Sequence, residues 1–380
     1  MQALRKIPDS FPHPRRARGF SGRVFPVFLP FAGCGTRCIF CAQHIQTGTA
    51  RKSVALTLED AGRQLDLLEG EAPELAFYGG TFTALPPEDL ALCLDFTRAR
   101  LKSGRIRAAR CSTRPDCLDA ETLRARRDSG FYLLELGVQS FQDEALKRAR
   151  RGYDRDGARR ACAAVREAGF ALGIQLMPGM PGLDVAGAAR DVRLAAAEKP
   201  ACARLYPCLV FAGTELAELW LRGLYRPPEL TATVSFLAWA ISRLQAAGIP
   251  VIRTGLAHTP ELEKNVLAGP LHPALGNMAR SLALFYRIRK QARRLAAKAP
   301  LELTVPRSLQ GEFWGHKRAL AGKYLEIGIG RKRVRWGDEG EFILRACEDE
   351  SPLPIFSRSG SSAVFPPPGA GGSPCPPPGV

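Results

Sequence analysis

The sequence predicts an α/β fold, a partial (β/α)6-type barrel followed by a small basic α+β appendage. Three observations lead to this fold class. Apolar runs alternate with amphipathic helical segments from about residue 24 to residue 254. Glycine-rich or polar motifs follow several of these runs, as at the carboxyl ends of barrel strands. The length of 380 residues and a hydrophobic content of 46% provide for one large core and a smaller second unit.

The alternation predicts βαβ units, because strands separated by helical segments form parallel sheets. The candidate strands are Val24–Phe31, Glu74–Tyr78, Ile106–Cys111, Tyr132–Val138, Ala171–Met177, Arg204–Val210 and Pro250–Thr254. The candidate helices are about 57–69, 87–102, 119–129, 154–168, 184–198 and 229–247. Six or seven such units fit a full or partial barrel, so we expect a barrel over residues 24–256.

The rest of the chain differs from this pattern. Residues 1–23 form a basic leader, and residues 257–346 form a basic C-terminal appendage whose α+β part begins near residue 274. In the appendage we expect a basic helix (277–298), a strand (301–305), a helical piece (314–324) and a small β region to about Leu344. Residues 347–380 are rich in Pro, Gly and Ser, which predicts a disordered tail.

The net charge of +17 is unevenly distributed. Residues 1–23 contain six basic and one acidic residue, and residues 280–336 contain fifteen basic and three acidic ones. A localised basic block is typical of a surface that binds a polyanion such as nucleic acid. A solvated arginine-rich face is the alternative interpretation.

No run of about 18 apolar residues occurs, so we expect no membrane span. The first twenty residues are basic and lack the apolar segment of a secretory signal. The eleven cysteines include one tight cluster, which suits a reducing compartment better than a disulfide framework. Together these features predict a cytoplasmic protein.

The cysteine cluster is Cys34-Gly-Thr-Arg-Cys38-Ile-Phe-Cys41, a C-x3-C-x2-C motif directly after the first apolar run. Three thiolates this close together can ligate one metal centre. A 4Fe–4S cluster takes four cysteines when fully ligated, so three would leave one iron open to a substrate or cofactor. A zinc site with His44 as fourth ligand, or three separate core thiols, are the alternatives.

This motif resembles the signature of the radical SAM superfamily. The resemblance implies Cys34, Cys38 and Cys41 as ligands of a catalytic 4Fe–4S cluster, with S-adenosylmethionine on the open iron. It also implies that the glycine pair after the second strand binds the methionine moiety and that polar residues at later strand ends bind the ribose or carboxylate. The implied cofactor-binding residues are Phe40, Gly79, Gly80, Thr81, Ser112, Gln139, Ser140, Arg151 and Gln175.

The order of the motifs is more specific. The segments CGTRCIFC, AFYGGTFTALP, ELGVQS, MPGMPG and RLYPCLVFAGT, followed by Trp220 and Tyr225, are similar to the radical SAM domain of the Elongator catalytic subunit and its bacterial relatives, over about residues 20–226. That family modifies wobble uridine of tRNA with acetyl-CoA as donor. No acetyl-CoA loop follows here, so we expect no acetyltransferase domain and leave the full reaction open.

The resemblance and the basic block together predict a radical SAM enzyme that modifies RNA, such as a tRNA, with an electron donor such as flavodoxin or ferredoxin. Candidate substrate residues are His272, His316, Lys317 and Arg318. Aromatic residues among the basic ones (Trp314, Tyr324, Trp336) suit base stacking, or alternatively form the core of the appendage. A small-molecule substrate and a non-catalytic iron–sulfur RNA-binding protein are the alternative functions.

Overall fold

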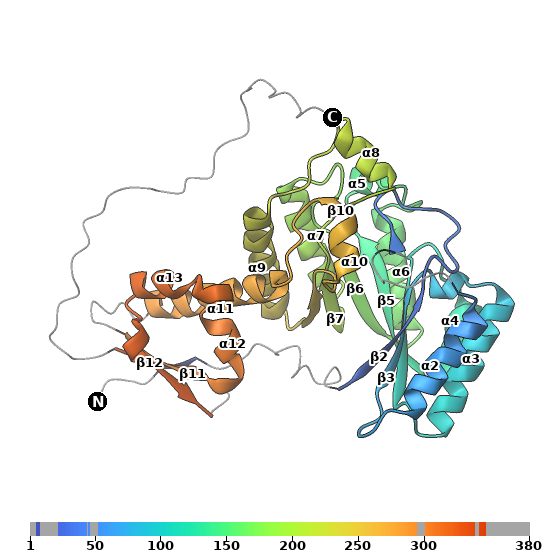
Figure 1. Ribbon diagram of the computed structural model, residues 1–380, viewed down its shortest axis with the longest axis horizontal. Coiled ribbons are helices and arrows are strands. Elements are labelled where there is room, and N and C mark those ends of the chain that lie inside the picture. The colour runs from blue at the N-terminus through green and yellow to red at the C-terminus, as the bar shows by residue number, and fades with distance from the viewer. Residues whose placement is uncertain are drawn as a thin grey trace.

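The computed structural model describes residues 5–7, 22–43, 45, 52–294, 301–338 and 342–346. Figure 1 shows a curled parallel sheet with its helices, and a smaller unit of C-terminal elements beside it. The predicted α/β class with an α+β appendage is thereby confirmed. The predicted tail, 347–380, and most of the leader lie outside the described residues.

The half-barrel is a single seven-stranded sheet in which every neighbouring pair of strands is parallel. Its strands follow one another in chain order: β2 (Val24–Leu29), β3 (Glu74–Gly79), β4 (Ala108–Thr113), β5 (Phe131–Gln139), β6 (Ala171–Leu176), β7 (Cys202–Leu205) and β9 (Val251–Thr254). Because the strands are parallel, their carboxyl ends meet at one edge of the sheet. That edge is where barrel enzymes carry their sites.

Helices pack against one face of this sheet (Figure 1). They are α2 (Val54–Asp66), α3 (Pro87–Lys102), α4 (Ala120–Asp128), α6 (Arg155–Glu167), α7 (Val185–Ala197) and α9 (Leu230–Ala246). Two short helices, α5 (Asp143–Arg148) and α8 (Glu215–Leu221), lie at the carboxyl edge and pack with the loop that contains Cys38, and a short 3₁₀ turn, η1 (Phe82–Ala84), follows β3. Polar residues and a cavity lie on the concave face of the sheet. Apolar residues such as Phe77, Leu134 and Leu237 fill the layer between sheet and helices.

Side-chain caps set where several helices begin. Ser53, Asp154 and Asp184 accept hydrogen bonds from the backbone N–H groups at the start of α2, α6 and α7. The first helix therefore begins at Val54, three residues before the position expected from its apolar pattern. The cap, which the periodicity does not include, accounts for the difference.

The predicted strand over 204–210 is wrong as one element. Strand β7 ends at Leu205, and a separate short strand, β8 (Val210–Phe211), pairs antiparallel with β10 (Val266–Ala268). Pro207 lies between them and has no N–H to donate to a ladder. The chain turns there, and the N–H of Cys208 instead donates to the carbonyl of Pro178 at 2.9 Å.

The C-terminal unit is built on α11 (Leu275–Arg294), which packs against α9 of the half-barrel. Its sheet has the order β1-β13-β11-β12. The remaining elements are α10 (Pro260–Asn265), β11 (Leu301–Pro306), η2 (Arg307–Leu309), α12 (Gln310–Phe313), η3 (His316–Arg318), α13 (Ala321–Glu326), η4 (Arg331–Arg333), β12 (Val334–Gly337) and β13 (Phe342–Ala346).

One strand of this C-terminal sheet comes from the other end of the chain. Strand β1 (Arg5–Ile7), within the segment expected as a basic leader, pairs antiparallel with β13, and Arg5 lies opposite Leu344. A segment near the N-terminus thus completes the sheet of the C-terminal unit. Residues 257–273, expected in the appendage, include Leu262, which packs with Leu209 and Phe211 of the half-barrel.

Aromatic side chains form the core of the C-terminal unit. The rings of Phe313 and Tyr324 are stacked with centroids 4.2 Å apart, and Phe285, Trp314 and Trp336 surround them. Phe313 and Tyr324 are fully buried, so the core interpretation of these aromatics holds for Tyr324. The hydroxyl of Tyr324 has no hydrogen-bond partner among the described residues.

Among the described residues, none of the helices combines the length and the apolar character that crossing a membrane requires.

We expect Phe313→Ala to lower the free energy of unfolding by about 3–5 kcal/mol, because it removes the largest contact of a packed aromatic core. Tyr324→Phe is the matched control. It keeps the ring and deletes only the unpartnered hydroxyl, so it should change stability by no more than about 1 kcal/mol, in the stabilising direction. Urea denaturation followed by tryptophan fluorescence measures both values. Equal losses in the two variants would contradict this description of the core.

Candidate active site

The three clustered cysteines face one cavity of about 670 Å³ on the concave side of the half-barrel. Cys38 is buried, and Cys34 and Cys41 are partly buried. The loop that carries them turns tightly after β2: Phe31 has a positive φ of 58°, and the N–H of Cys34 donates to the Phe31 carbonyl at 3.1 Å. The sequence therefore brings all three thiols of the C-x3-C-x2-C motif to the same space.

The glycine pair after β3 holds this loop in place. The N–H of Gly80 donates to the Leu29 carbonyl at 2.9 Å, and that of Thr81 donates to the Ala32 carbonyl at 2.8 Å. A Cβ on Gly80 would lie 1.9 Å from the Ala32 carbonyl oxygen, which no side chain permits. The Cys34 thiol lies 3.3 Å from the Thr81 hydroxyl. Glycine is thus required here for the close approach of two backbone segments.

Two buried guanidinium groups face the middle cysteine. Nη1 of Arg151 donates to Cys38 Sγ at 3.0 Å, and Nη1 of Arg114 lies 3.7 Å from the same sulfur. Arg151 also bonds Tyr153 at 2.9 Å, and Arg114 is paired with Asp116 at 2.7 Å. The sequence-based expectation placed Arg151 among the cofactor-binding residues; in the structure it lines the cysteine cavity, and its guanidinium contacts the Cys38 sulfur.

The electrostatics suit a metal centre that binds thiolates. Burial, together with the neighbouring Cys38 and Cys34, raises the pKa of the Cys41 thiol to about 12. Such a thiol ionises only if a cation binds it, as a coordinating metal ion does. Soft thiolate donors in a set of three fit an iron–sulfur cluster with one open position. The residues present therefore fit such a cluster.

The thiols line the cavity without gathering around a single point. The part of the chain that the structure describes contains no group of three His, Cys, Asp or Glu side chains arranged for one metal ion. His44, the candidate fourth ligand of a zinc site, lies outside the described residues.

Most of the expected cofactor residues line this same cavity. They are Phe40, Gly79, Gly80, Thr81, Ser112, Gln139, Arg151 and Gln175, contributed by the cysteine loop and by β3 to β6 with the loops that follow them. Gln175 Nε2 donates to Gln139 Oε1 at 3.1 Å, so the two amides are held together. Gln139 has a positive φ of 66°, which turns the chain sharply at the end of β5.

Ser140 is the exception. It is fully buried, lies outside the cavity lining, and donates its hydroxyl to Asp191 at 2.6 Å. Asp191 also accepts from the Phe141 N–H at 2.9 Å and from Gln142 at 2.8 Å. Burial raises the pKa of Asp191, and the three donors oppose that shift. Ser140 thus holds the turn after β5, and a sequence pattern does not distinguish this role from ligand binding.

Sequence reasoning missed the polar floor of the cavity, which is formed by Tyr78, Arg110, Arg204 and Tyr206. Glu135, whose direction the sequence left open, points into the half-barrel and is paired with Arg204 through both carboxylate oxygens. Tyr78 donates to Glu135 at 3.0 Å, and Arg204 donates to the hydroxyl of Tyr206 at 2.9 Å. Burial tends to raise the pKa of Glu135, but Arg204 and Arg110 outweigh it and hold that pKa below its ordinary value.

Alternation along the strands could have indicated part of this floor. Arg110 and Ser112 on β4 are two residues apart, as are Arg204 and Tyr206 around the end of β7, and such residues share one face of a strand. Which residue of another strand each would meet depends on the register of the sheet, and no local pattern gives that register.

The candidate substrate residues form a separate group where the C-terminal unit meets the half-barrel. The rings of His272 and His316 lie edge to face, with centroids 5.1 Å apart. Lys317 and Arg318 follow directly and both have positive φ, of 50° and 61°. Burial lowers the pKa of His272, and His316 and Lys317 lower it further. The structure thus brings these residues together, but outside the lining of the cysteine cavity.

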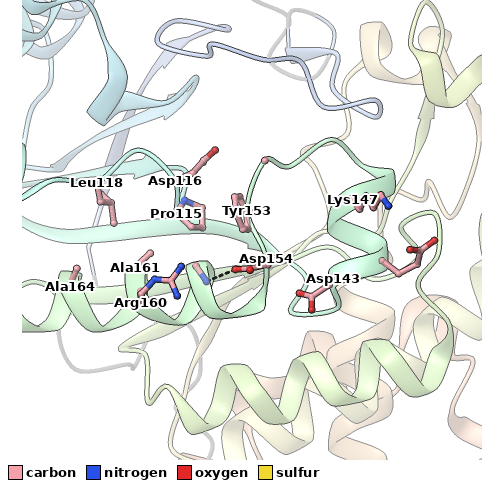
Figure 2. Close-up of a pocket in the computed structure, with 13 residues that line it drawn as sticks. Pro115, Asp116, Leu118, Asp143, Lys147, Tyr153, Asp154, Arg160, Ala161 and Ala164 are labelled. Carbon is pink, nitrogen blue, oxygen red and sulfur yellow. Dashed lines mark hydrogen bonds between the residues drawn. The ribbon is translucent and has the colours of Figure 1, made fainter.

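A larger, more open hollow of about 960 Å³ contains none of the three cysteines (Figure 2). Asp154 on its wall caps α6 by accepting from the Gly157 N–H at 2.7 Å, as the dashed line in Figure 2 shows. Asp116 on the same wall is paired with Arg114. Since these polar groups already have partners in the fold, we take the cysteine cavity as the site.

Comparison with known proteins agrees with this choice. Residues 28–195 match the Radical SAM superfamily, and residues 200–283 match the Radical_SAM C-terminal domain. The chain belongs to the radical SAM superfamily. It is therefore a radical SAM enzyme, and membership implies a 4Fe–4S cluster and S-adenosylmethionine as cofactors.

Its relatives include tRNA-modifying proteins. The chain is 30% identical to the "tRNA uridine(34) acetyltransferase" of Methanocaldococcus infernus over 49% of its own length and 38% of that protein. It is 28% identical to "Elongator complex protein 3" of Danio rerio, over 53% of this chain and 41% of that protein. The chain thus spans about two fifths of the length of these relatives.

Among solved structures, the archaeal Elp3 of Methanocaldococcus infernus with an N-terminal deletion is similar in fold. It superposes with a TM-score of 0.54 at 23% identity, over 71% of this chain and 63% of that chain. The similarity supports the half-barrel architecture of this radical SAM enzyme.

We expect Gly80→Ala to displace the cysteine loop, because its methyl group would collide with the backbone of Ala32. After anaerobic reconstitution, iron content should fall from about four atoms per chain to less than about one. Gly35→Ala, in the same loop, is the matched control, since a Cβ there meets nothing within 4 Å. Full iron incorporation in Gly80→Ala would show that the close approach of the two segments is not required.

Proposed function

We propose that this protein uses a 4Fe–4S cluster on Cys34, Cys38 and Cys41 to cleave S-adenosylmethionine reductively in the modification of an RNA such as tRNA. The observation that carries the proposal is the single cavity lined by all three thiols of the motif and by the polar residues at the carboxyl ends of β3 to β6. When bound, the cluster and S-adenosylmethionine supply a one-electron cleavage that yields a 5′-deoxyadenosyl radical.

Within this proposal the residues of the chain hold and orient the cofactors. The carbonyls of the Gly79–Thr81 segment accept hydrogen bonds from the methionine ammonium, and the amides of Gln139 and Gln175 bond the ribose hydroxyls. Phe40 packs beside the adenine ring. Arg151 and Arg114 balance the negative charge at Cys38, with Nη1 atoms 3.0 and 3.7 Å from its sulfur. The apolar and backbone walls exclude water from the reacting atoms.

An RNA substrate is supported by charge and by the named activities of relatives. Residues 280–336 contain fifteen basic and three acidic residues. Along α11, Tyr286 and four cationic side chains (Arg289, Lys290, Arg293, Arg294) line a surface hollow of about 460 Å³. Cations beside an aromatic ring suit phosphates and unpaired bases. Similarity to a tRNA uridine(34) acetyltransferase supports tRNA among RNAs.

Two other functions remain as alternatives within this account. A radical SAM enzyme with a small-molecule substrate would have the same cavity but no need for the basic block. A non-catalytic iron–sulfur RNA-binding protein would bind RNA without cleaving S-adenosylmethionine. An external electron donor such as flavodoxin or ferredoxin would approach at the exposed Arg37 of the cysteine loop.

The radical chemistry is tested by reconstituting the protein with iron and sulfide under anaerobic conditions, then adding dithionite and S-adenosylmethionine. We expect 5′-deoxyadenosine from the wild type and none above background from Cys38→Ala. Cys93→Ala, which removes a buried thiol far from the motif, should keep wild-type activity. A correctly assembled wild-type cluster that gives no product, with RNA or without it, would favour the non-catalytic binder.

The RNA substrate is tested by the salt dependence of binding to bulk tRNA. Each phosphate contact adds about 0.9 to the slope of log K against log salt on duplex DNA and about 0.7 on single strands. The double variant Lys317→Gln, Arg318→Gln should therefore lower the slope by about 1 to 2 and weaken binding equally for different tRNAs. The control is Arg63→Gln, Arg98→Gln, two exposed arginines of α2 and α3. If the Lys317→Gln, Arg318→Gln variant left the slope unchanged, η3 would not be part of the surface that binds tRNA.

A further inference from the structure

Arg110 is a buried cation that faces the cysteine cavity. It lies on β4, two residues before Ser112, and both residues line the cavity. Its side chain is about nine-tenths buried, with 5% relative exposure for the residue. Residues two apart on a strand share a face, and a strand rises about 3.3 Å per residue. Arg110 therefore lies about 7 Å deeper in the half-barrel than Ser112.

The carboxylates near Arg110 already have closer partners. Glu74 accepts from Arg107 at 2.6 Å and from Tyr132 at 2.9 Å. Glu135 is paired with Arg204 through both of its oxygens and accepts from Tyr78. Both carboxylates therefore make their hydrogen bonds to other residues, although each also lies within ion-pair distance of Arg110.

Arg110 itself makes no hydrogen bond with any residue that the structure describes. Its Nε lies 3.7 Å from Glu74 and 3.8 Å from Glu135, within the range of ion pairing but beyond that of a hydrogen bond. The Nε atom is buried and has no hydrogen-bond partner. A guanidinium carries five N–H donors in a rigid fork, and Arg110 makes ion pairs with Glu74 and Glu135 but no hydrogen bond to the residues that the structure describes. Its Nη atoms are not among the buried atoms that lack a partner, and the side chain lines the cavity, so an acceptor that enters the cavity can reach them.

The neighbouring groups of the cavity floor suit an anion. The hydroxyls of Tyr78 and Tyr206 and the guanidinium of Arg204 line the same space as Arg110. Among the described residues that line the cavity, none is Asp or Glu. A carboxylate or phosphate entering there would meet the guanidinium groups of Arg110 and Arg204 and the hydroxyl of Tyr206, and the nearby Glu135 is already paired with Arg204 and Tyr78.

We infer that Arg110 binds the terminal oxyanion, a carboxylate or phosphate, of a small second substrate that occupies the cavity together with S-adenosylmethionine. The inference rests on the proposed function for the cofactor and adds a co-substrate to it. Within the proposed function, the Gly79–Thr81 segment would hold the methionine moiety at the carboxyl end of β3, so the carboxylate of the cofactor would not occupy the floor at Arg110. An internal RNA phosphate is flanked by two riboses, which a buried floor excludes, so the anion is the end of a small molecule.

The test is calorimetric titration of the reconstituted protein with malonate and with inorganic phosphate, in the presence of S-adenosylmethionine. We expect Arg110→Gln to weaken binding of the better probe at least tenfold. Arg110→Lys keeps the charge but loses the fork, so its affinity should lie between those of Arg110→Gln and the wild type. Arg98→Gln is the control, since Arg98 is an exposed arginine of α3 that does not line the cavity, and it should bind within twofold of wild type. Unchanged binding in Arg110→Gln and Arg110→Lys would overturn the inference.

A second measurement needs no variant. Wild-type crystals soaked in bromide should show an anomalous peak beside the Arg110 guanidinium, and bromide peaks elsewhere with none at Arg110 would overturn the inference. Both readouts are independent of S-adenosylmethionine cleavage. Binding that depends on Arg110 without formation of 5′-deoxyadenosine would refute the proposed function alone. Formation of 5′-deoxyadenosine without an anion at Arg110 would refute this inference alone.

Discussion

The contact on which the rest of the site depends is the close approach of the cysteine loop to the glycine pair after β3. Two backbone hydrogen bonds, from Gly80 to Leu29 and from Thr81 to Ala32, join these segments at 2.9 and 2.8 Å. No side chain fits between them at Gly80. With the loop held there, Cys34 lies against Thr81 and Cys38 reaches the guanidinium of Arg151. The glycine pair thus shapes the site before it contacts any ligand.

A second constraint is the placement of charge inside the half-barrel. Arg151 and Arg114 lie at the thiols, and Arg110 and Arg204 lie at the floor of the same cavity. Glu135 neutralises Arg204 directly, because its two carboxylate oxygens form a bidentate pair with the guanidinium. Burying cations is costly unless anions accompany them. The cavity therefore suits negatively charged groups at two depths. The thiolates lie near the strand ends, and the proposed oxyanion lies deeper in the half-barrel, at Arg110.

The sequence allowed much of this fold to be predicted because its main signals are local. Apolar runs separated by helical periodicity predicted the strands and helices of the half-barrel, and most of the cofactor residues expected near the ends of those runs line the cavity. The strand expected over 204–210 was wrong because Pro207 interrupts the ladder, and the apolar pattern continues across it into β8. Helix α2 begins three residues before the expected position, because the Ser53 cap that starts it is polar and is not part of the apolar repeat from which the helix was predicted.

The remaining differences involve contacts between residues distant in sequence. Ser140 binds Asp191, fifty-one positions later, so its hydroxyl is not available to a cofactor. Arg204 meets Glu135 across two strands, sixty-nine positions apart. The pairing of Arg5–Ile7 with β13 joins segments more than three hundred positions apart. Periodicity and spacing along the sequence do not identify such partners, because the order and register of the strands in the sheet determine which residues meet.

The central claim is that Cys34, Cys38 and Cys41 leave one iron of a cluster open to S-adenosylmethionine. The most direct measurement is electron paramagnetic resonance of the reconstituted, dithionite-reduced protein, recorded before and after S-adenosylmethionine is added. The account predicts the signal of a reduced 4Fe–4S cluster whose g-values shift when the sulfonium compound binds. A signal that S-adenosylmethionine leaves unchanged, or a protein that takes up zinc in place of iron, would contradict it.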